Sequence, residues 1–222
     1  MDGSSDEKSS SSTASNIVFR PIDTTTNGQD QEHVWTILRE AAHDTEVSLH
    51  DTQANPLLQP YATNFGGRPG DVGILAMDQE TAASHDKDND NDNNDATTEK
   101  LVGGAWVRIL PEGFAVSVLQ DKDHPVRQMP ELAIAVMPQY RNRGMGRRLL
   151  KALLDQVQSN NDTIPGVCLS CRLDNTSAMK LYEKVGFQVV EGSHQTNRAG
   201  GTSVTMAYEF HKDETVIWMA YY

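Results

Sequence analysis

The sequence predicts a mixed α/β domain built around one three-layer core. Apolar residues occur as short runs typical of β-strands, as in residues 131–137, and as stripes at helical spacing, as in residues 149–157. The segments follow one another as strand, helix, irregular region, two strands, and then strand, helix, strand, helix and two strands. The 222 residues suffice for one domain with extensions, and they contain no internal repeat.

The N-terminal part begins with a predicted strand at residues 16–22 (NIVFRPI) and continues with an amphipathic helix. Asp30 is the expected N-cap of this helix, because a short polar side chain can accept a hydrogen bond from the first turn. Residues 48–70 contain three prolines and three glycines, so they are not expected to form one regular element. The helix carries an apolar stripe at helical spacing, formed by Val34, Ile37, Leu38 and Ala41.

Two segments of biased composition are expected to be disordered. Residues 1–15 are rich in serine, and residues 82–99 (AASHDKDNDNDNNDATTE) are rich in aspartate and asparagine, so neither can bury enough apolar surface to offset the entropy of ordering. The second lies between predicted strands at 71–78 and 101–110, which makes it an enlarged hairpin loop. We therefore expect an N-terminal tail and a single domain over residues 16–222.

The formal net charge of −12 is concentrated in these segments. The tail contributes −2 and residues 78–100 contribute −6, which leaves −4 for the rest of the chain. Such a domain lacks the basic surface that nucleic-acid binding requires. No run approaches 18 apolar residues and the N-terminus is polar, so neither a membrane span nor a secretory signal is predicted. A cytoplasmic protein is expected, with the nucleus as an alternative.

Cys168 and Cys171 have the C-x-x-C spacing of redox and zinc sites. Their segment alternates like a strand, however, and residues three apart on a strand point to opposite faces. The sequence has no second C-x-x-C or H-x-x-x-H pair that would complete a zinc site. We therefore expect structural, reduced cysteines and no metal.

Strands and helices alternate in the C-terminal half. Residues 131–137 (ELAIAVM) form a near-continuous apolar run typical of a strand covered on both faces. A helix, a strand at 166–173 and a helix at 175–187 that ends at Gly186 follow. FQVVEG and residues 202–210 are expected to pair antiparallel, and the last residues form either a further strand or a packed tail. The apolar stripes of the two helices are formed by Leu149, Leu150, Leu153, Leu154 and Val157, and by Ala178, Leu181, Tyr182 and Val185.

Residues 140–150 (YRNRGMGRRLL) form a glycine- and arginine-rich turn between a strand and a helix. The first turn of a helix has unpaired N–H groups and a positive dipole end, glycines allow close approach, and arginines bind phosphate. The stretch therefore predicts a pyrophosphate site. A Walker loop would need a lysine that is absent here, and a dinucleotide fingerprint would need glycine where Leu149 stands.

The remaining pattern is R-x-x-G-x-G, formed by Arg141, Gly144 and Gly146. With its surroundings, ELAIAVMPQYRNRGMGRRLL and SCRLDNTSAMKLYEKVGF, the chain resembles the GNAT superfamily of acetyl-CoA-dependent N-acetyltransferases over residues 16–210. The resemblance implies a twisted, mostly antiparallel sheet of about seven strands, splayed at the cofactor site and flanked by about four helices. It also implies acetyl-CoA as co-substrate.

The same resemblance assigns residues to the cofactor. The pantetheine arm would pair with the exposed strand edge at Ile134, Ala135 and Val136. Asn175 would contact this arm, although the residue alone is equally typical of a helix N-cap. Backbone N–H groups of the loop would bind the pyrophosphate, namely those of Arg141, Asn142, Arg143, Gly144, Met145, Gly146 and Arg147.

For catalysis, the resemblance implies direct attack of an amine on the thioester in a ternary complex. Tyr182 would contact the cofactor and act as the general acid, although its position on an apolar stripe also allows simple core packing. The backbone N–H of Val136 would polarise the thioester carbonyl. Glu131 is the first candidate for a general base or water organiser, against a surface or strand-end carboxylate, and His124 is the second.

The acceptor is expected to contact residues 48–71, the region that varies in the resembling family. Tyr61, Phe65 and Arg68 are candidate pocket residues, with packing of the loop as the alternative. The predicted acceptor is a primary amine of a small molecule or peptide, and the protein is expected to be a monomer or homodimer without nucleic-acid or membrane partners. Two other functions stay open: a catalytically inactive acetyl-CoA sensor or scaffold, and a nucleotide-binding regulatory domain.

Overall fold

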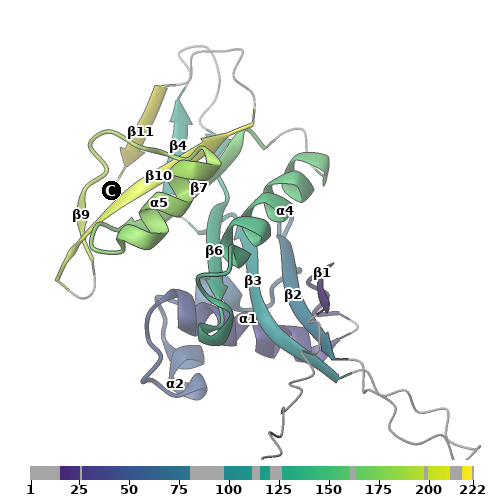
Figure 1. Ribbon diagram of the computed structural model, residues 1–222. Coiled ribbons are helices and arrows are strands. Elements are labelled where there is room, and N and C mark those ends of the chain that lie inside the picture. The colour runs from purple at the N-terminus through teal and green to yellow at the C-terminus, as the bar shows by residue number, and fades with distance from the viewer. Residues whose placement is uncertain are drawn as a thin grey trace, which may run out of the picture.

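The computed structural model describes residues 16–25, 27–80, 98–111, 116–120, 127–160, 164–197, 200–210 and 217–221. A large sheet has helices on both faces (Figure 1). Its strands run in the order β1 (Asn16–Pro21), β2 (Val72–Glu80), β3 (Thr98–Arg108), β6 (Glu131–Val136), β7 (Gly166–Arg172), β10 (Thr202–Glu209) and β8 (Gln188–Val189), and β9 (Gln195–Thr196) pairs with β10. A smaller sheet has the order β11 (Ile217–Tyr221), β4 (Val116–Gln120) and β5 (Arg127–Gln128).

The helices are α1 (Gly28–Ala41), α2 (Leu49–Ala54), α3 (Gln59–Ala62), α4 (Met145–Asn160) and α5 (Thr176–Val185), and a single 3₁₀ turn, η1, covers Pro138–Tyr140. All strand pairs in the large sheet are antiparallel except β6 with β7. No helix among the described residues is long and apolar enough to span a bilayer.

The core has the three layers that the sequence predicts. Along β2, Ile74 and Ala76 pack on the face covered by α4, whereas Leu75 and Met77 pack on the face covered by α1 and α3. The five predicted apolar residues of α4 are all buried, and so are Val34, Ile37 and Leu38 of α1. Helical periodicity therefore identified the correct inward face of both helices.

The predicted N-cap of α1 is wrong. Asn27 caps the helix by accepting a hydrogen bond from the N–H of Gln29, three residues upstream of the expected position. Asp30 is instead fully buried in the first turn, where both of its carboxylate oxygens accept hydrogen bonds from Arg20 at 2.7 Å. The ion pair between Asp30 and Arg20 of β1 outweighs the local preference of aspartate for a cap position. Burial opposes ionisation of Asp30, but this ion pair and the hydrogen bond from the backbone N–H of Asp23 hold its pKa below the usual range.

The hairpin formed by β2 and β3 is paired as far as Glu80 opposite Thr98. β3 therefore includes residues 98–99, which the sequence analysis placed in the enlarged loop. The rest of that loop, like the predicted tail at 1–15, lies outside the described residues. The C-terminal residues 217–221 form a strand, β11, which pairs antiparallel with β4.

Candidate functional site

The sheet opens between β6 and β7. On one side, β6 pairs with β3 along its length, from Glu131 opposite Arg108 to Val136 opposite Gly103. On the other side, it shares only one residue pair with β7, Glu131 with Cys168. The two strands diverge from there, so most of this edge of β6 is left without a neighbouring strand (Figure 1).

Strand alternation decides which backbone groups open into this gap. The N–H of Met137 donates to the carbonyl of Val102 at 2.8 Å, so odd-numbered residues of β6 direct their backbone groups toward β3 and even-numbered residues direct theirs toward β7. The backbone of Ala135 therefore faces β3, and those of Ile134 and Val136 face the gap. Among the described residues, neither of their N–H groups has an acceptor.

The gap is part of a cavity of about 1240 Å³ that extends from the start of α4 past β6, β7 and α5 to α1, α3 and β9. Most predicted site residues line it. Arg143 does not, and it is exposed. The predicted residues that line the cavity are Glu131, Ile134, Ala135, Val136, Arg141, Asn142, Gly144, Met145, Gly146, Arg147, Asn175 and Tyr182.

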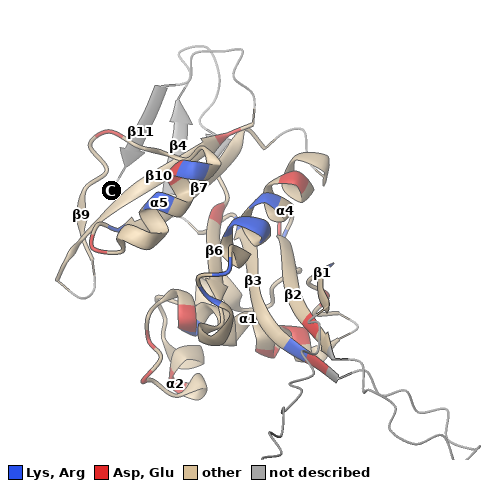
Figure 2. Ribbon diagram, viewed as in Figure 1, with Lys and Arg blue, Asp and Glu red and all other residues tan. Residues whose placement is uncertain are grey.

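Unpaired backbone N–H groups gather at one end of the cavity, where α4 begins. Arg148 is the first residue to donate into the helix, to Gly144, and the N–H groups of residues 142–147 have no acceptor among the described residues. Asn142 (φ 60°) and Gly144 (φ 74°) adopt the left-handed conformation, which turns successive N–H groups into an anion-binding concavity. The chain is rich in arginine at this end, where Figure 2 shows blue segments in the ribbon before and at the start of α4.

Arg141 contributes to the loop in a different way from the sequence prediction. Its own N–H donates to Pro138, and its guanidinium donates to the carbonyl of Val136 at 2.8 Å and to Glu40 of α1 at 2.7 Å. Because these donors are engaged within the protein, Arg141 braces the loop against β6 and α1. Nothing in the sequence could have indicated Glu40, which lies 101 residues away.

Gly146 favours close packing as well as access. A Cβ atom at this position would lie 3.1 Å from Cδ2 of Leu181, so the start of α4 packs closely on α5 and another residue would require the Leu181 side chain to shift by a few tenths of an ångström. At Gly144, a Cβ atom would meet no atom within 4 Å, and the positive φ is the reason for glycine.

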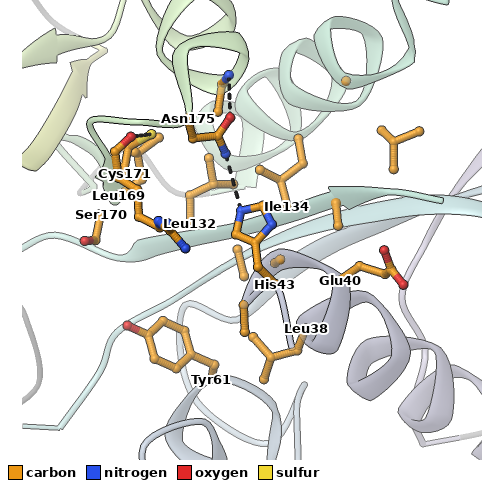
Figure 3. Close-up of a pocket in the computed structure, with 18 of the residues that line it drawn as sticks. Leu38, Glu40, His43, Tyr61, Leu132, Ile134, Leu169, Ser170, Cys171 and Asn175 are labelled. Carbon is orange, nitrogen blue, oxygen red and sulfur yellow. Dashed lines mark hydrogen bonds between the residues drawn. The ribbon is translucent and has the colours of Figure 1, made fainter. Parts of the chain in front are cut away.

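Asn175 caps α5 and also faces the cavity. Its side-chain oxygen accepts from the N–H of Ala178 at 3.1 Å, while its side-chain nitrogen lies 3.4 Å from Nε2 of His43 (Figure 3). Both alternatives for Asn175 are thus compatible: it is an N-cap, and its amide remains directed toward the ligand space. His43, which follows the C-cap of α1, was not identified from the sequence.

Tyr182 lines the cavity from α5, and its ring packs on Phe187 with centroids 5.8 Å apart. Burial raises the pKa of its phenol, and the neighbouring Cys171 thiol has the same effect when it ionises. Tyr182 therefore keeps its proton at neutral pH.

Cys171 also lines the cavity, and burial raises the pKa of its thiol to about 11. Cys168 does not line the cavity, and its thiol bonds weakly to the main-chain oxygens of Met129 and Pro130. Both cysteines are reduced and buried.

Glu131 lies at the point where β6 and β7 meet and is 5% exposed. Oε1 accepts a hydrogen bond from the hydroxyl of Tyr61 at 2.9 Å, and the buried Oε2 has no partner among the described residues. Burial raises the pKa of Glu131 to about 8, although the Tyr61 hydrogen bond opposes this. Such a carboxyl can both accept and release a proton near neutral pH. His124, the other candidate base, lies outside the described residues.

Of the three candidate acceptor residues, Tyr61 alone lines the cavity. Phe65 is a core residue, 3% exposed, whose ring contacts Trp106 edge-on at 6.0 Å. Arg68 is exposed and outside the cavity, so packing and loop geometry account for both. Leu57 and Leu58, within the predicted acceptor region 48–71, also line the cavity, although they were not singled out. Cavity-lining residues missed by the sequence analysis include Val47 on this side and Gln195, Thr196 and Asn197 opposite.

The large sheet opens between β6 and β7 next to the unpaired N–H groups at the start of α4. This is the arrangement that the resemblance to GNAT acetyltransferases implies. The acetyltransferase (GNAT) family matches residues 75–187, about half of the chain, and the chain belongs to this family.

Among curated relatives, the N-alpha-acetyltransferase RimI of Mycobacterium tuberculosis is 40% identical over 80 residues, which are 36% of this chain and 46% of that protein. The [Ribosomal protein bS18]-alanine N-acetyltransferase of Escherichia coli is 39% identical over 54 residues, 24% of this chain and 35% of that protein. The matches thus span less than half of the length of these relatives.

Solved structures share the fold. A GNAT-family acetyltransferase from Streptococcus pneumoniae aligns with a TM-score of 0.55 and 14% identity over 88% of this chain and 100% of its own. NAA60 of Arabidopsis thaliana, in complex with acetyl-CoA, aligns with a TM-score of 0.53 and 19% identity over 88% of this chain and 99% of its own. At these identities, the likeness is one of fold.

Proposed function

We propose that this protein is an N-acetyltransferase that moves an acetyl group from acetyl-CoA to a primary amine of a small molecule or peptide by direct attack. The carrying observation is a single cavity that joins unpaired N–H groups at the start of α4 and along β6 to a buried carboxyl, Glu131, and a protonated phenol, Tyr182. Membership of the GNAT family supports the same reaction.

The cavity fits the parts of acetyl-CoA in order. The N–H groups of residues 142–147 and the positive end of α4 suit a diphosphate. The N–H groups of Ile134 and Val136 suit the amide carbonyls of a pantetheine arm or the thioester carbonyl, and the Asn175 amide would contact the same arm in place of His43. Bound acetyl-CoA supplies an activated acyl group.

The protein side chains would move two protons. Glu131 accepts one from the acceptor ammonium, directly or through water, so that the nitrogen lone pair can attack. As the new C–N bond forms and the C–S bond breaks, the backbone N–H of Val136 stabilises the developing negative charge on oxygen. Tyr182 donates its proton to the departing thiolate, and the second proton that the acceptor nitrogen loses on becoming an amide returns to the Tyr182 phenolate, directly or through water.

The reaction can be tested by incubating the protein with acetyl-CoA and a panel of amines, and by measuring both CoA thiol release and the mass of the acceptor. Because the relatives include an N-alpha-acetyltransferase and a [Ribosomal protein bS18]-alanine N-acetyltransferase, peptide α-amines come first in this panel, followed by lysine side chains and polyamines. A mass increase of one acetyl group supports the proposal. Tight binding of acetyl-CoA without transfer to any amine supports the inactive sensor instead.

The diphosphate cradle can be tested at Gly144, where a side chain has open space. Gly144→Asp places a negative charge among the N–H groups of the loop, and Gly144→Asn is the matched neutral control, because both residues tolerate a positive φ. We expect the Asp variant to bind acetyl-CoA about 30 to 100 times more weakly, equivalent to about 2–3 kcal/mol, and the Asn variant to stay within about threefold of the parent. Isothermal titration calorimetry measures both. Equal dissociation constants for the two variants would show that the diphosphate does not bind at this loop.

A further inference from the structure

A buried cation lies directly opposite Glu131 without pairing with it. Arg108 of β3 and Glu131 of β6 are cross-strand partners, and both side chains are buried on the face covered by α1 and α3. Opposite charges at such positions normally attract each other and pair. A direct ion pair would hold the Glu131 carboxyl ionised at all physiological pH values.

The guanidinium of Arg108 is engaged elsewhere. It donates to both carboxylate oxygens of Asp71, at 2.8 and 2.7 Å, in an ion pair with side chains at most 1% exposed. Its remaining N–H groups donate to main-chain carbonyls of the segment around α3, those of Pro60 (3.2 Å), Thr63 (2.8 Å) and Asn64 (2.9 Å). Arg108 therefore anchors this segment to β3, and Asp71 compensates its charge.

The anchored segment carries Tyr61. The indole N–H of Trp106 donates to the Tyr61 carbonyl at 3.0 Å, so bonds from β3 hold the backbone at and on both sides of this residue. From this fixed position, the Tyr61 hydroxyl reaches Oε1 of Glu131. Figure 3 shows the Tyr61 ring pointing from α3 into the cavity.

The surroundings of Glu131 leave it few other influences. Tyr61 of α3 donates a hydrogen bond to it, and Arg108 of β3 and Cys168 of β7 are its partners across the sheet. Of the charged groups of α1 and β7 that line the same cavity, Glu40 is paired with Arg141 and Arg172 with Asp174, and the other titratable groups of β7 and α5 that line it are Cys171 and Tyr182. Burial and the Tyr61 hydrogen bond are the two influences on the pKa of Glu131, and they act in opposite directions.

We propose that Tyr61 is a positioning residue that aims the Glu131 carboxyl into the part of the cavity lined by α2 and α3, where the acceptor is expected, and that the Asp71–Arg108 ion pair fixes Tyr61 while withholding the Arg108 charge from Glu131. Its use in catalysis rests on the proposed function. The arrangement itself is a property of the protein without substrates, and it is therefore testable in their absence.

The test is a pH titration of Glu131 in the protein without ligand, followed by NMR of ¹³C-labelled glutamate side chains and assigned by the signal that Glu131→Gln removes. In Tyr61→Phe, loss of the hydrogen bond to the ionised carboxylate is expected to raise the midpoint by about one pH unit. Tyr140→Phe, which breaks another tyrosine–carboxylate bond at Asp78, is the matched control and should leave the midpoint unchanged. An unchanged midpoint in Tyr61→Phe overturns the positioning role.

Asp71→Asn should shift the midpoint in the opposite direction. Without its counter-charge, Arg108 favours the ionised form of Glu131, so the midpoint falls by about one pH unit or more. A folded Asp71→Asn protein with the parent midpoint overturns this part of the proposal, and if the variant does not fold, Tyr61→Phe decides alone. With an acceptor amine in hand, the acidic limb of the pH–rate profile should move with each midpoint. Midpoints that shift while the rate profile stays fixed preserve the positioning role and reject Glu131 as the base.

Discussion

Replacement of Tyr182 by phenylalanine is expected to lower kcat by about 100- to 1000-fold, while the dissociation constant of acetyl-CoA stays within about twofold. The substitution removes the proposed proton donor but keeps the ring that packs on Phe187. Steady-state kinetics with a saturating amine and calorimetric binding of acetyl-CoA measure the two quantities separately.

Tyr208→Phe is the matched control for this experiment. Tyr208 belongs to the same row of aromatic rings, with its centroid 5.5 Å from that of Phe187, but it does not line the cavity. Its variant should retain kcat. If Tyr182→Phe also retained kcat, the leaving thiolate would have to receive its proton from another group, and Tyr182 would be only a packing residue.

Replacement of Glu131 by glutamine is expected to remove the pH dependence that this residue gives to the reaction. A carboxyl with a pKa of about 8 is protonated below that value and cannot accept a proton from the acceptor, so the parent rate should rise through pH 8 and then level off. The variant should lack this rise and be at least about tenfold slower at pH 9. The same acceptor is used for both proteins, so its own ionisation affects both profiles equally. Identical profiles would show that Glu131 takes no part in proton removal.

The same substitution should increase stability at alkaline pH, which distinguishes it from a damaging change. The pKa of Glu131 is raised from 4.5 to about 8 on folding, so between these values the folded state binds more protons than the unfolded state. The free energy of unfolding therefore decreases as pH rises through this window. Glutamine removes the dependence, and Glu131→Gln should resist urea better than the parent at pH 9 but not at pH 4.5.

Much of the fold could be predicted because it depends on local periodicity. The stripe from Leu149 to Val157 and the apolar run from Glu131 to Val136 identify α4 and β6 without information from the rest of the chain. The glycine–arginine pattern likewise placed a turn with unpaired N–H groups at the start of α4.

The contacts that complete the site depend on tertiary structure. Arg141 contacts Glu40, which is 101 residues away in the sequence, and Asn175 contacts His43, which is 132 residues away. Local sequence patterns cannot predict contacts between residues so far apart in the chain. The sequence left the role of Glu131 open between a base and a surface or strand-end carboxylate, because a shift of one residue reverses the face of a strand. Its pairing with Arg108 fixes the register and places Glu131 on the face of Tyr61.

The single residue pair between β6 and β7 has a consequence for the molecule as a whole. The sheet has two halves, one made of β1, β2, β3 and β6 and the other of β7, β10 and β8. Backbone pairing joins them only where Glu131 of β6 meets Cys168 of β7. An acyl donor lying along Ile134 and Val136 would accept the backbone hydrogen bonds that β7 does not accept there. It would then stabilise the sheet as well as take part in the reaction. Each turnover would then break and re-form these contacts between β6 and β7, so the exchange of the acyl donor and the local stability of the sheet at this position are coupled.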